Sequence, residues 1–202
     1  GTANVLATEI EFPITLEGVA RRILQGQVER VTVGKANERY FLLMAGIGLD
    51  AAVTIGVDPD LKKKFGKAAF AISALKVAYE WNLAPFRVHL PGGEEIVARY
   101  VVAGNAHSYG GGFQVTPRAD LKDEYLDLCI FTSDKRINYV IYATAALVGA
   151  HSELEGVIYR KVKRCRITEA SDVCDLVQLD GEVSGRLPLD LEAIPQGVKL
   201  LV

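Results

Sequence analysis

Cysteine is scarce in this chain of 202 residues, and the spacing of the few cysteines excludes the usual cysteine chemistry. The three cysteines are Cys129, Cys165 and Cys174. They form no C-x-x-C pair and their number is odd, so we expect neither a disulfide framework nor a cysteine-rich zinc site. The pattern fits reduced, structural thiols of the kind found in cytoplasmic proteins.

Long apolar runs and strong net charge are also missing. No stretch approaches the roughly 20 apolar residues that span a bilayer, and the first residues lack the basic region and apolar run of a signal peptide. The formal net charge is −2, and no block of Lys or Arg is longer than the lysines at 62–64. The chain therefore has no electrostatic footprint for nucleic acid, and we expect no nucleic-acid partner.

Hydrophobic residues are plentiful, since they make up 50% of the sequence. In a chain of this length, that proportion is enough for one well-buried core. The first residues, Gly1-Thr2-Ala3-Asn4, are not an ordinary translation start. We therefore expect the chain to be a piece of a longer protein.

Many short strands and few helices are expected along the chain. Helical spacing and composition predict helices at 3–10, 16–25, 67–81 and 137–148. This content favours an antiparallel β-sandwich with helical segments, mainly β within the α+β class, over a doubly wound parallel sheet. Strands are predicted at 28–33 and 39–45, which form a hairpin, and at 87–90, 96–103, 126–131, 159–168, 176–179 and 198–202.

Two carboxylates lie two positions apart in the run Leu179-Asp180-Gly181-Glu182-Val183. On an extended strand such positions project from the same face. A carboxylate that faces a like charge can act as a general base towards a hydroxyl. However, Asp-Gly is also among the strongest turn signals, and charged residues at hairpin tips are usually solvated. From the pattern alone, a hairpin turn is the better interpretation.

A second acidic segment, residues 117–127, precedes a predicted strand and contains Asp120, Asp123, Glu124 and Asp127. Hard cations prefer such oxygen-rich loops, and one carboxylate with two backbone carbonyls and several waters would suit Mg²⁺. Without further information, a polar turn is the better interpretation.

Glycine-rich segments and histidines give weaker signals. The glycines at 110–112 permit a tight turn or a close approach of the backbone to a ligand, and a sheet corner explains them equally well. The segment Gly46-Ile47-Gly48 is similar to a phosphate-binding turn but lacks the third glycine of the dinucleotide motif. The three histidines have no metal-site spacing.

The motifs of this sequence, taken together and in their order along the chain, resemble the diacylglycerol kinase and sphingosine kinase family along nearly the whole chain. The resemblance implies an amino-terminal α/β domain with a G-G-D-G-T nucleotide motif and a carboxy-terminal β-sandwich, of the fold shared with NAD kinase, that completes the cleft. Residues 1–202 would then be the β-sandwich domain, without the nucleotide-binding domain. The motifs are Gly1-Thr2-Ala3-Asn4, residues 45–51, Gly104-Asn105, residues 109–112, residues 117–127 and Leu179-Asp180-Gly181-Glu182.

The same resemblance implies roles for particular residues. Asp180 matches the general base that takes the proton of the lipid hydroxyl as it attacks the γ-phosphoryl group of ATP, and Glu182 supports it. Thr2 matches the threonine that touches ATP. A structural Mg²⁺ would be held by the carboxylate of Asp123 and the backbone carbonyls of Asp120 and Tyr125.

Three positions depart from the family pattern. Val5 stands where many relatives have Asp in G-T-x-N-D, and Thr32 stands where an acidic residue is expected in a V-D-x-G turn. The change at Thr32 argues against a charge network between the Mg²⁺ loop and the active site. Glu124 replaces the usual glycine of a D-G turn, which predicts a loop of different shape.

The leading hypothesis is therefore the carboxy-terminal domain of an ATP-dependent lipid kinase that phosphorylates a diacylglycerol-like hydroxyl and is inactive as an isolated fragment. Its cofactors would be Mg²⁺ and the co-substrate ATP. Its partners would be the missing amino-terminal domain and a lipid at the cytoplasmic face of the membrane. A non-catalytic lipid- or protein-binding sandwich and a kinase for a soluble hydroxyl such as that of NAD are the alternatives. The identity of the lipid and a homodimer both stay open.

Overall fold

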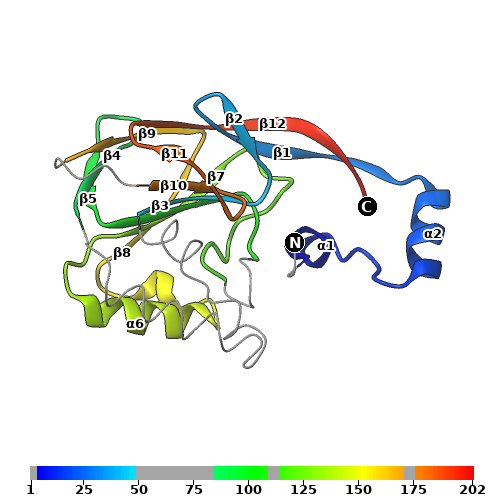
Figure 1. Ribbon diagram of the computed structural model, residues 1–202, viewed down its shortest axis with the longest axis horizontal. Coiled ribbons are helices and arrows are strands. Elements are labelled where there is room, and N and C mark those ends of the chain that lie inside the picture. The colour runs from blue at the N-terminus through cyan, green and yellow to red at the C-terminus, as the bar shows by residue number, and fades with distance from the viewer. Residues whose placement is uncertain (1–3, 49–83, 109–113, 171–175) are drawn as a thin grey trace.

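Two six-stranded antiparallel sheets form the body of the computed structural model (Figure 1). The structure describes residues 4–48, 84–108, 114–170 and 176–202. Every strand pairing is antiparallel, which confirms the predicted sandwich. In order across the first sheet lie β2 (Arg39–Phe41), β1 (Val28–Ala36), β12 (Leu189–Leu201), β9 (Arg164–Glu169), β4 (Phe86–His89) and β5 (Glu95–Ala98). In order across the second lie β11 (Glu182–Arg186), β10 (Leu176–Leu179), β3 (Met44–Gly48), β6 (Tyr100–Gly104), β7 (Leu126–Phe131) and β8 (Val157–Val162).

The main hydrophobic core lies between the two sheets. Alternate residues of β4, Phe86 and Val88, pack there from the first sheet, and Leu128 and Ile130 of β7 pack there from the second. All six residues of β7 are buried because its other face is covered by α6 (Arg136–Ala146). Because both faces of β7 are covered, its sequence is a nearly continuous apolar run and does not alternate between apolar and polar residues.

Three segments that the sequence predicts as single strands are each divided between the two sheets. The segment 39–45 separates into β2 and β3, 96–103 into β5 and β6, and 159–168 into β8 and β9. The apolar pattern continues through each corner, because both halves face the same core. The corners therefore leave no turn signal in the sequence. The segment Gly46-Ile47-Gly48 is part of buried β3 and is not a phosphate-binding turn.

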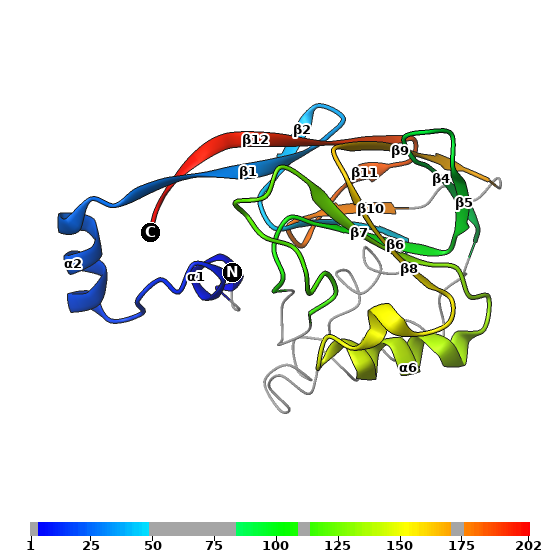
Figure 2. The same cartoon turned by 180° about the vertical axis from the view of Figure 1, so that it is seen from behind.

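The predicted amino-terminal helices are present as α1 (Val5–Glu9) and α2 (Leu16–Gln25). The side chain of Thr15 caps α2 by accepting a hydrogen bond from the N–H of Gly18, and Gly26 ends the helix with a left-handed φ of 65°. Helix α2 and the adjoining ends of β1 and β12 extend away from the sandwich as an arm (Figures 1 and 2). The helix predicted at 67–81 lies outside the described residues.

Two helical segments lie beside the second sheet. Helix α6 agrees with the helix predicted at 137–148, and the short 3₁₀ helix η1 (His151–Glu153) follows it. Of the residues of α6, Tyr139, Tyr142 and Ala146 are buried. None of the helices in the described part of the chain is long and apolar enough to cross a membrane.

Candidate active-site hairpin and the acidic loop

A two-residue turn joins β10 to β11 and carries Asp180. Asp180 and Gly181 both have positive φ angles, of 49° and 87°, and Leu179 pairs with Glu182 across the turn. This is the geometry that favours Asp-Gly in tight hairpins, and it confirms the turn interpretation. The argument that Asp180 and Glu182 share one face of an extended strand does not apply, because the turn lies between them.

The carboxylate of Asp180 is anchored by backbone N–H groups. Its Oδ2 accepts from the N–H of Leu42 at 2.7 Å, and its Oδ1 accepts from Leu43 at 2.8 Å and Met44 at 3.0 Å. The N–H of Asp180 in turn donates to the carbonyl of Met44 at 2.9 Å. The turn therefore clamps the segment in which the chain passes from the first sheet to the second. The turn interpretation predicted a solvated side chain. Instead, backbone hydrogen bonds hold this carboxylate in one orientation.

The anchored carboxylate nevertheless remains open to solvent, since Asp180 is exposed. A carboxylate has about four lone-pair sites, so three hydrogen bonds leave one site free to receive a proton. Glu182 is also exposed, and within the described residues its carboxylate makes no hydrogen bond or ion pair. The hairpin therefore presents one oriented carboxylate and one free carboxylate to the solvent.

A chain of hydrogen bonds leads from this hairpin to the acidic loop. The side-chain amide of Asn105, directly after β6, donates to the carbonyl of Leu42 and to the carbonyl of Thr32, both at 2.8 Å. The hydroxyl of Thr32 donates to the backbone carbonyl of Asp123 at 2.5 Å. The link between Asp180 and the acidic loop thus consists of the neutral side chains of Asn105 and Thr32 and the backbone. Thr32 is the position where an acidic residue was expected. Gly104 beside Asn105 leaves room for Thr116, since a Cβ at position 104 would lie 1.9 Å from its Oγ1.

The acidic loop is joined to β8 and β9 by lysines. Nζ of Lys161 contacts Oδ2 of Asp123 and lies 3.6 Å from Oδ2 of Asp127. Asp127 is fully buried, and burial raises the pKa of its carboxyl, which the nearby charge of Lys161 partly opposes. Glu124 pairs with Lys163 at 2.8 Å. The loop carboxylates at 123, 124 and 127 thus all lie beside ammonium groups.

These contacts do not fit the Mg²⁺ site predicted at Asp120, Asp123 and Tyr125. The ammonium of Lys161 lies against the one carboxylate that would carry the ion. The carbonyl of Asp120 already accepts the N–H of Asp123 at 3.0 Å. The loop as it stands therefore presents no open set of oxygen ligands around Asp123.

Helix α1 is attached to the sandwich by a side chain that the sequence gave no reason to select. The Glu9 side chain, only 4% exposed, accepts the N–H of His107 at 2.8 Å and of Ser108 at 3.0 Å. Nδ1 of His107 lies 2.7 Å from the same carboxylate. Glu9 therefore positions the helix that follows Thr2. Both Thr2 and the glycines at 110–112 lie outside the described residues.

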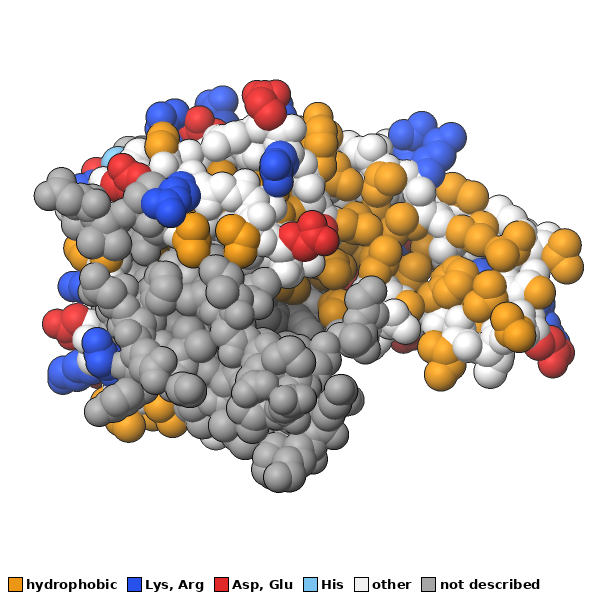
Figure 3. All heavy atoms as spheres, in the orientation of Figure 1, with side chains coloured by type: hydrophobic (Ala, Val, Ile, Leu, Met, Phe, Trp, Pro, Cys, Tyr) orange, Lys and Arg blue, Asp and Glu red, His pale blue; other side chains and the backbone are white. Residues whose placement is uncertain are grey.

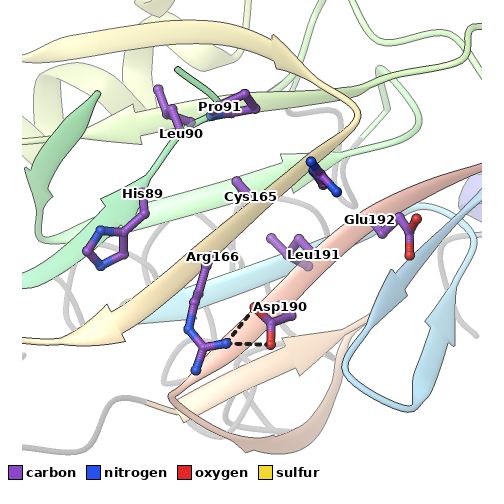
Figure 4. A pocket seen from close by; sticks show the side chains of 9 residues that line it. His89, Leu90, Pro91, Cys165, Arg166, Asp190, Leu191 and Glu192 are labelled. Carbon is purple, nitrogen blue, oxygen red and sulfur yellow. Dashed lines mark hydrogen bonds and ion pairs between the residues drawn. The ribbon is translucent and has the colours of Figure 1, made fainter. Parts of the chain in front are cut away.

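A separate pocket of about 360 Å³ lies over β4, β9 and β12 (Figure 4). Some of its charged side chains are paired, whereas those of Arg164 and Glu192 make no hydrogen bond or ion pair with the described residues. Arg166 binds the carboxylate of Asp190 at 2.9 Å, and Nε2 of His89 lies 2.8 Å from the hydroxyl of Thr168. None of these carboxylates is held by three backbone N–H groups as that of Asp180 is, so the hairpin remains the better candidate site.

The two sheets and the anchored hairpin define an antiparallel β-sandwich domain, and comparisons with known proteins identify its family. The family model described as the YegS C-terminal NAD kinase beta sandwich-like domain matches residues 44–202. A protein of Mycobacterium tuberculosis named diacylglycerol kinase is 30% identical over 209 residues, which cover 100% of this chain and 66% of the relative. A protein of Staphylococcus aureus with the same name is 28% identical, with 93% of this chain and 59% of the relative covered.

Solved structures give the same result. The crystal structure of a diacylglycerol kinase from Bacillus anthracis matches with a TM-score of 0.73 and 25% identity, covering 100% of this chain and 66% of that one. The chain thus belongs to the diacylglycerol kinase family and corresponds to the carboxy-terminal part of its members. It spans less than two thirds of the length of the curated relatives, at 66% and 59%.

Proposed function

We propose that this chain is the carboxy-terminal domain of an ATP-dependent lipid kinase that phosphorylates a diacylglycerol-like hydroxyl. The observation that carries the proposal is the carboxylate of Asp180, which three backbone N–H groups hold in one orientation while it stays exposed. A base that is already oriented does not have to be ordered during the reaction, which lowers the barrier. The names of the curated relatives support the kinase class.

In the proposed reaction, the lipid hydroxyl attacks the γ-phosphorus of ATP. The new bond joins the lipid oxygen to that phosphorus, and the bond from the phosphorus to the bridging oxygen breaks to release ADP. Asp180 accepts the hydroxyl proton, and Glu182 supports it from the start of β11. Mg²⁺ would accompany ATP and offset the charge of its phosphates, and Thr2 would contact the nucleotide.

The proposed partners are an amino-terminal nucleotide-binding domain of the same protein and a lipid at the inner face of the cytoplasmic membrane. Hydrophobic side chains gather on the arm (Figure 3), where Leu16 and Leu24 of α2 are 91% and 86% exposed. No residue of α2 is buried within the described structure. An apolar helix face of this kind is typical of an element that packs against another domain. The isolated chain is therefore expected to be inactive.

The test is Asp180→Asn in a protein that joins this chain to its nucleotide-binding domain. Asparagine tolerates the left-handed turn but cannot accept the hydroxyl proton, so kcat should fall by about 10²- to 10⁴-fold. KM for ATP should change little, because the base acts in the transition state. Steady-state kinetics with labelled ATP and diacylglycerol measure both constants.

The substitution also weakens the clamp on Leu42, because an amide nitrogen cannot accept a backbone hydrogen bond. The assay therefore has to be run at a temperature at which circular dichroism shows the variant to be folded. Asp190→Asn is the matched control, since it removes a surface ion pair with Arg166 on β9 and should leave turnover unchanged. A folded Asp180→Asn enzyme that matches the turnover of Asp190→Asn would show that Asp180 is only a clamp.

A further inference from the structure

We infer that the acidic loop 117–127 is held in place by an internal cation, the ammonium group of Lys161, in the position that a divalent metal ion would otherwise take. The inference concerns the stability of the loop and does not depend on the proposed kinase reaction. It follows from the position of Lys161, from the engagement of the loop backbone and from two departures from the family pattern.

The position of Lys161 is set by strand pairing. Lys161 of β8 lies directly opposite Asp127 of β7 in the register of the second sheet. From there, its side chain reaches both the buried carboxylate of Asp127 and the carboxylate of Asp123. A buried carboxylate is costly without an opposite charge, so the ammonium has a direct reason to remain between the two acids. Neither oxygen of Asp127 has a hydrogen-bond partner within ordinary distance, and the nearby Tyr159 hydroxyl, which also lowers the pKa of this carboxyl, carries no positive charge.

The backbone of the acidic loop also forms hydrogen bonds within the protein. The hydroxyl of Thr32 donates to the carbonyl of Asp123, and the N–H of Asp123 donates to the carbonyl of Asp120. Mg²⁺ requires near-octahedral oxygen ligands at short distances. To bind here, it would have to displace the ammonium from Asp123 or accept the repulsion of a like charge beside it.

Two departures from the family pattern point in the same direction. Thr32 supplies a neutral hydroxyl where an acidic residue was expected, which removes negative charge from the neighbourhood of the loop. Glu124 replaces a glycine, and its carboxylate pairs with Lys163 at the corner between β8 and β9. Lysine pairs thus attach the loop to the sandwich at two neighbouring positions, 123 and 124.

Direct contacts therefore link Lys161 to the hairpin. It fixes Asp123, whose carbonyl accepts from Thr32, and the hydrogen bonds of Asn105 continue the connection to Leu42 and Asp180. No metal ion is needed along this path, because every connection in it is a direct contact between protein atoms.

The test compares the thermal unfolding of four proteins in millimolar MgCl₂ and in EDTA. They are the unchanged chain and its variants Lys161→Gln, Lys161→Arg and Lys163→Gln. The unchanged chain should melt at the same temperature in both solutions. Lys161→Gln should melt several degrees lower in EDTA and recover part of the loss in MgCl₂, because two carboxylates are then free to bind the ion. Lys161→Arg should resemble the unchanged chain, because it keeps the charge.

Lys163→Gln is the matched control, because it removes an exposed lysine pair that has no buried carboxylate. It should show little loss and no response to Mg²⁺. The inference fails if MgCl₂ stabilises the unchanged chain, or if Lys161→Gln is as stable as Lys163→Gln. It also fails if Lys161→Gln gains nothing from Mg²⁺, since the ammonium would then not stand in for a metal ion. Loss of kinase activity in any assay would leave these outcomes unaffected.

Discussion

The carboxylate of Asp180 receives its three hydrogen bonds from consecutive backbone N–H groups at 42–44. Aspartate satisfies the turn and the clamp together, because it tolerates a positive φ and accepts hydrogen bonds through both oxygens. Glycine would keep the turn but release residues 42–44. The fold therefore constrains Asp180 as much as any catalytic role does. For this reason, the stability of each Asp180 variant has to be measured together with its turnover.

The buried thiols allow a test of the residue-level description of the core. Burial raises the pKa of Cys165 to about 12, and it also raises the pKa of Cys129 far above its ordinary value. Near neutral pH, almost no reactive thiolate is present at either residue. In the Cys174→Ser variant, we therefore expect no rapid reaction with Ellman's reagent in the native state and reaction of both remaining thiols in guanidinium chloride.

Absorbance at the wavelength of the released thiolate measures this reaction. The substitution at Cys174 is included because that residue lies outside the described structure, and its own reactivity would obscure the result. Rapid labelling of the native variant would contradict the burial of Cys129 and Cys165.

Among the elements, η1 places a histidine in the apolar layer beneath the second sheet. His151 is fully buried, its ring is stacked on Phe131 at 6.1 Å between centroids, and Nε2 lies 2.8 Å from the carbonyl of Val115. Burial lowers the pKa of His151 below its ordinary value of 6.5, against the opposing effect of the Val115 hydrogen bond. The folded chain therefore keeps the ring neutral at a pH at which the unfolded chain protonates it.

The direction of the resulting pH dependence follows from this difference in pKa. The stability contributed by His151 is fully present above the unfolded pKa and is lost as the pH falls below about 6.5 towards the lowered folded value. Urea unfolding at about pH 7.5 and about pH 5.5 should show a smaller loss of stability for His151→Gln than for the unchanged chain. Equal losses in the two proteins would mean that His151 does not titrate differently on folding.

The elements also show where sequence reasoning succeeds. Helix α2 was predicted with its observed bounds, because Thr15 and Gly26 are local signals that act within one turn of the helix. The Asp-Gly turn was predicted for the same reason. The corners near Arg99 and Lys163 were missed, since the apolar alternation continues through them while the strands change sheets.

The contacts of the candidate site could not be predicted in the same way. Asp180 meets Leu42 across 138 positions, and Glu9 meets His107 across 98. Contacts of this separation depend on how the sheets stack, and no local pattern encodes it. The family resemblance implied roles for Asp180 and Asp123. It did not predict the backbone hydrogen bonds of Asp180 or the ion pair between Lys161 and Asp123.

At the scale of the whole molecule, the arm gives a prediction about domain packing. In a protein that includes the nucleotide-binding domain, Leu24→Ser should lower the free energy of unfolding by about 1.5–3 kcal/mol, the usual cost of removing a buried leucine contact. In this chain alone, the same substitution should have little effect, because Leu24 is 86% exposed. Denaturant unfolding of both proteins measures the difference.

Arg21→Ser on the polar side of α2 is the control, because this side chain pairs only with Glu17 on the surface. It should change stability by no more than about 0.5 kcal/mol in either protein. A Leu24→Ser effect of the same size in the two proteins would mean that α2 does not pack against the added domain.

The pairing of β1 with β12 also determines when the sandwich can form during synthesis. Val28 lies opposite Leu201 and Ala36 lies opposite Leu191, so β1 depends on a strand that leaves the ribosome much later. Closing the long loop between β1 and β12 is slow compared with local strand pairing, because the chain loses conformational entropy before the contacts that stabilise the pair can form. The first sheet must therefore be completed after this segment has been released from the ribosome. Until then β1 has one unpaired edge, and a nascent chain truncated before Leu189 would present that edge to chaperones and to other copies of itself.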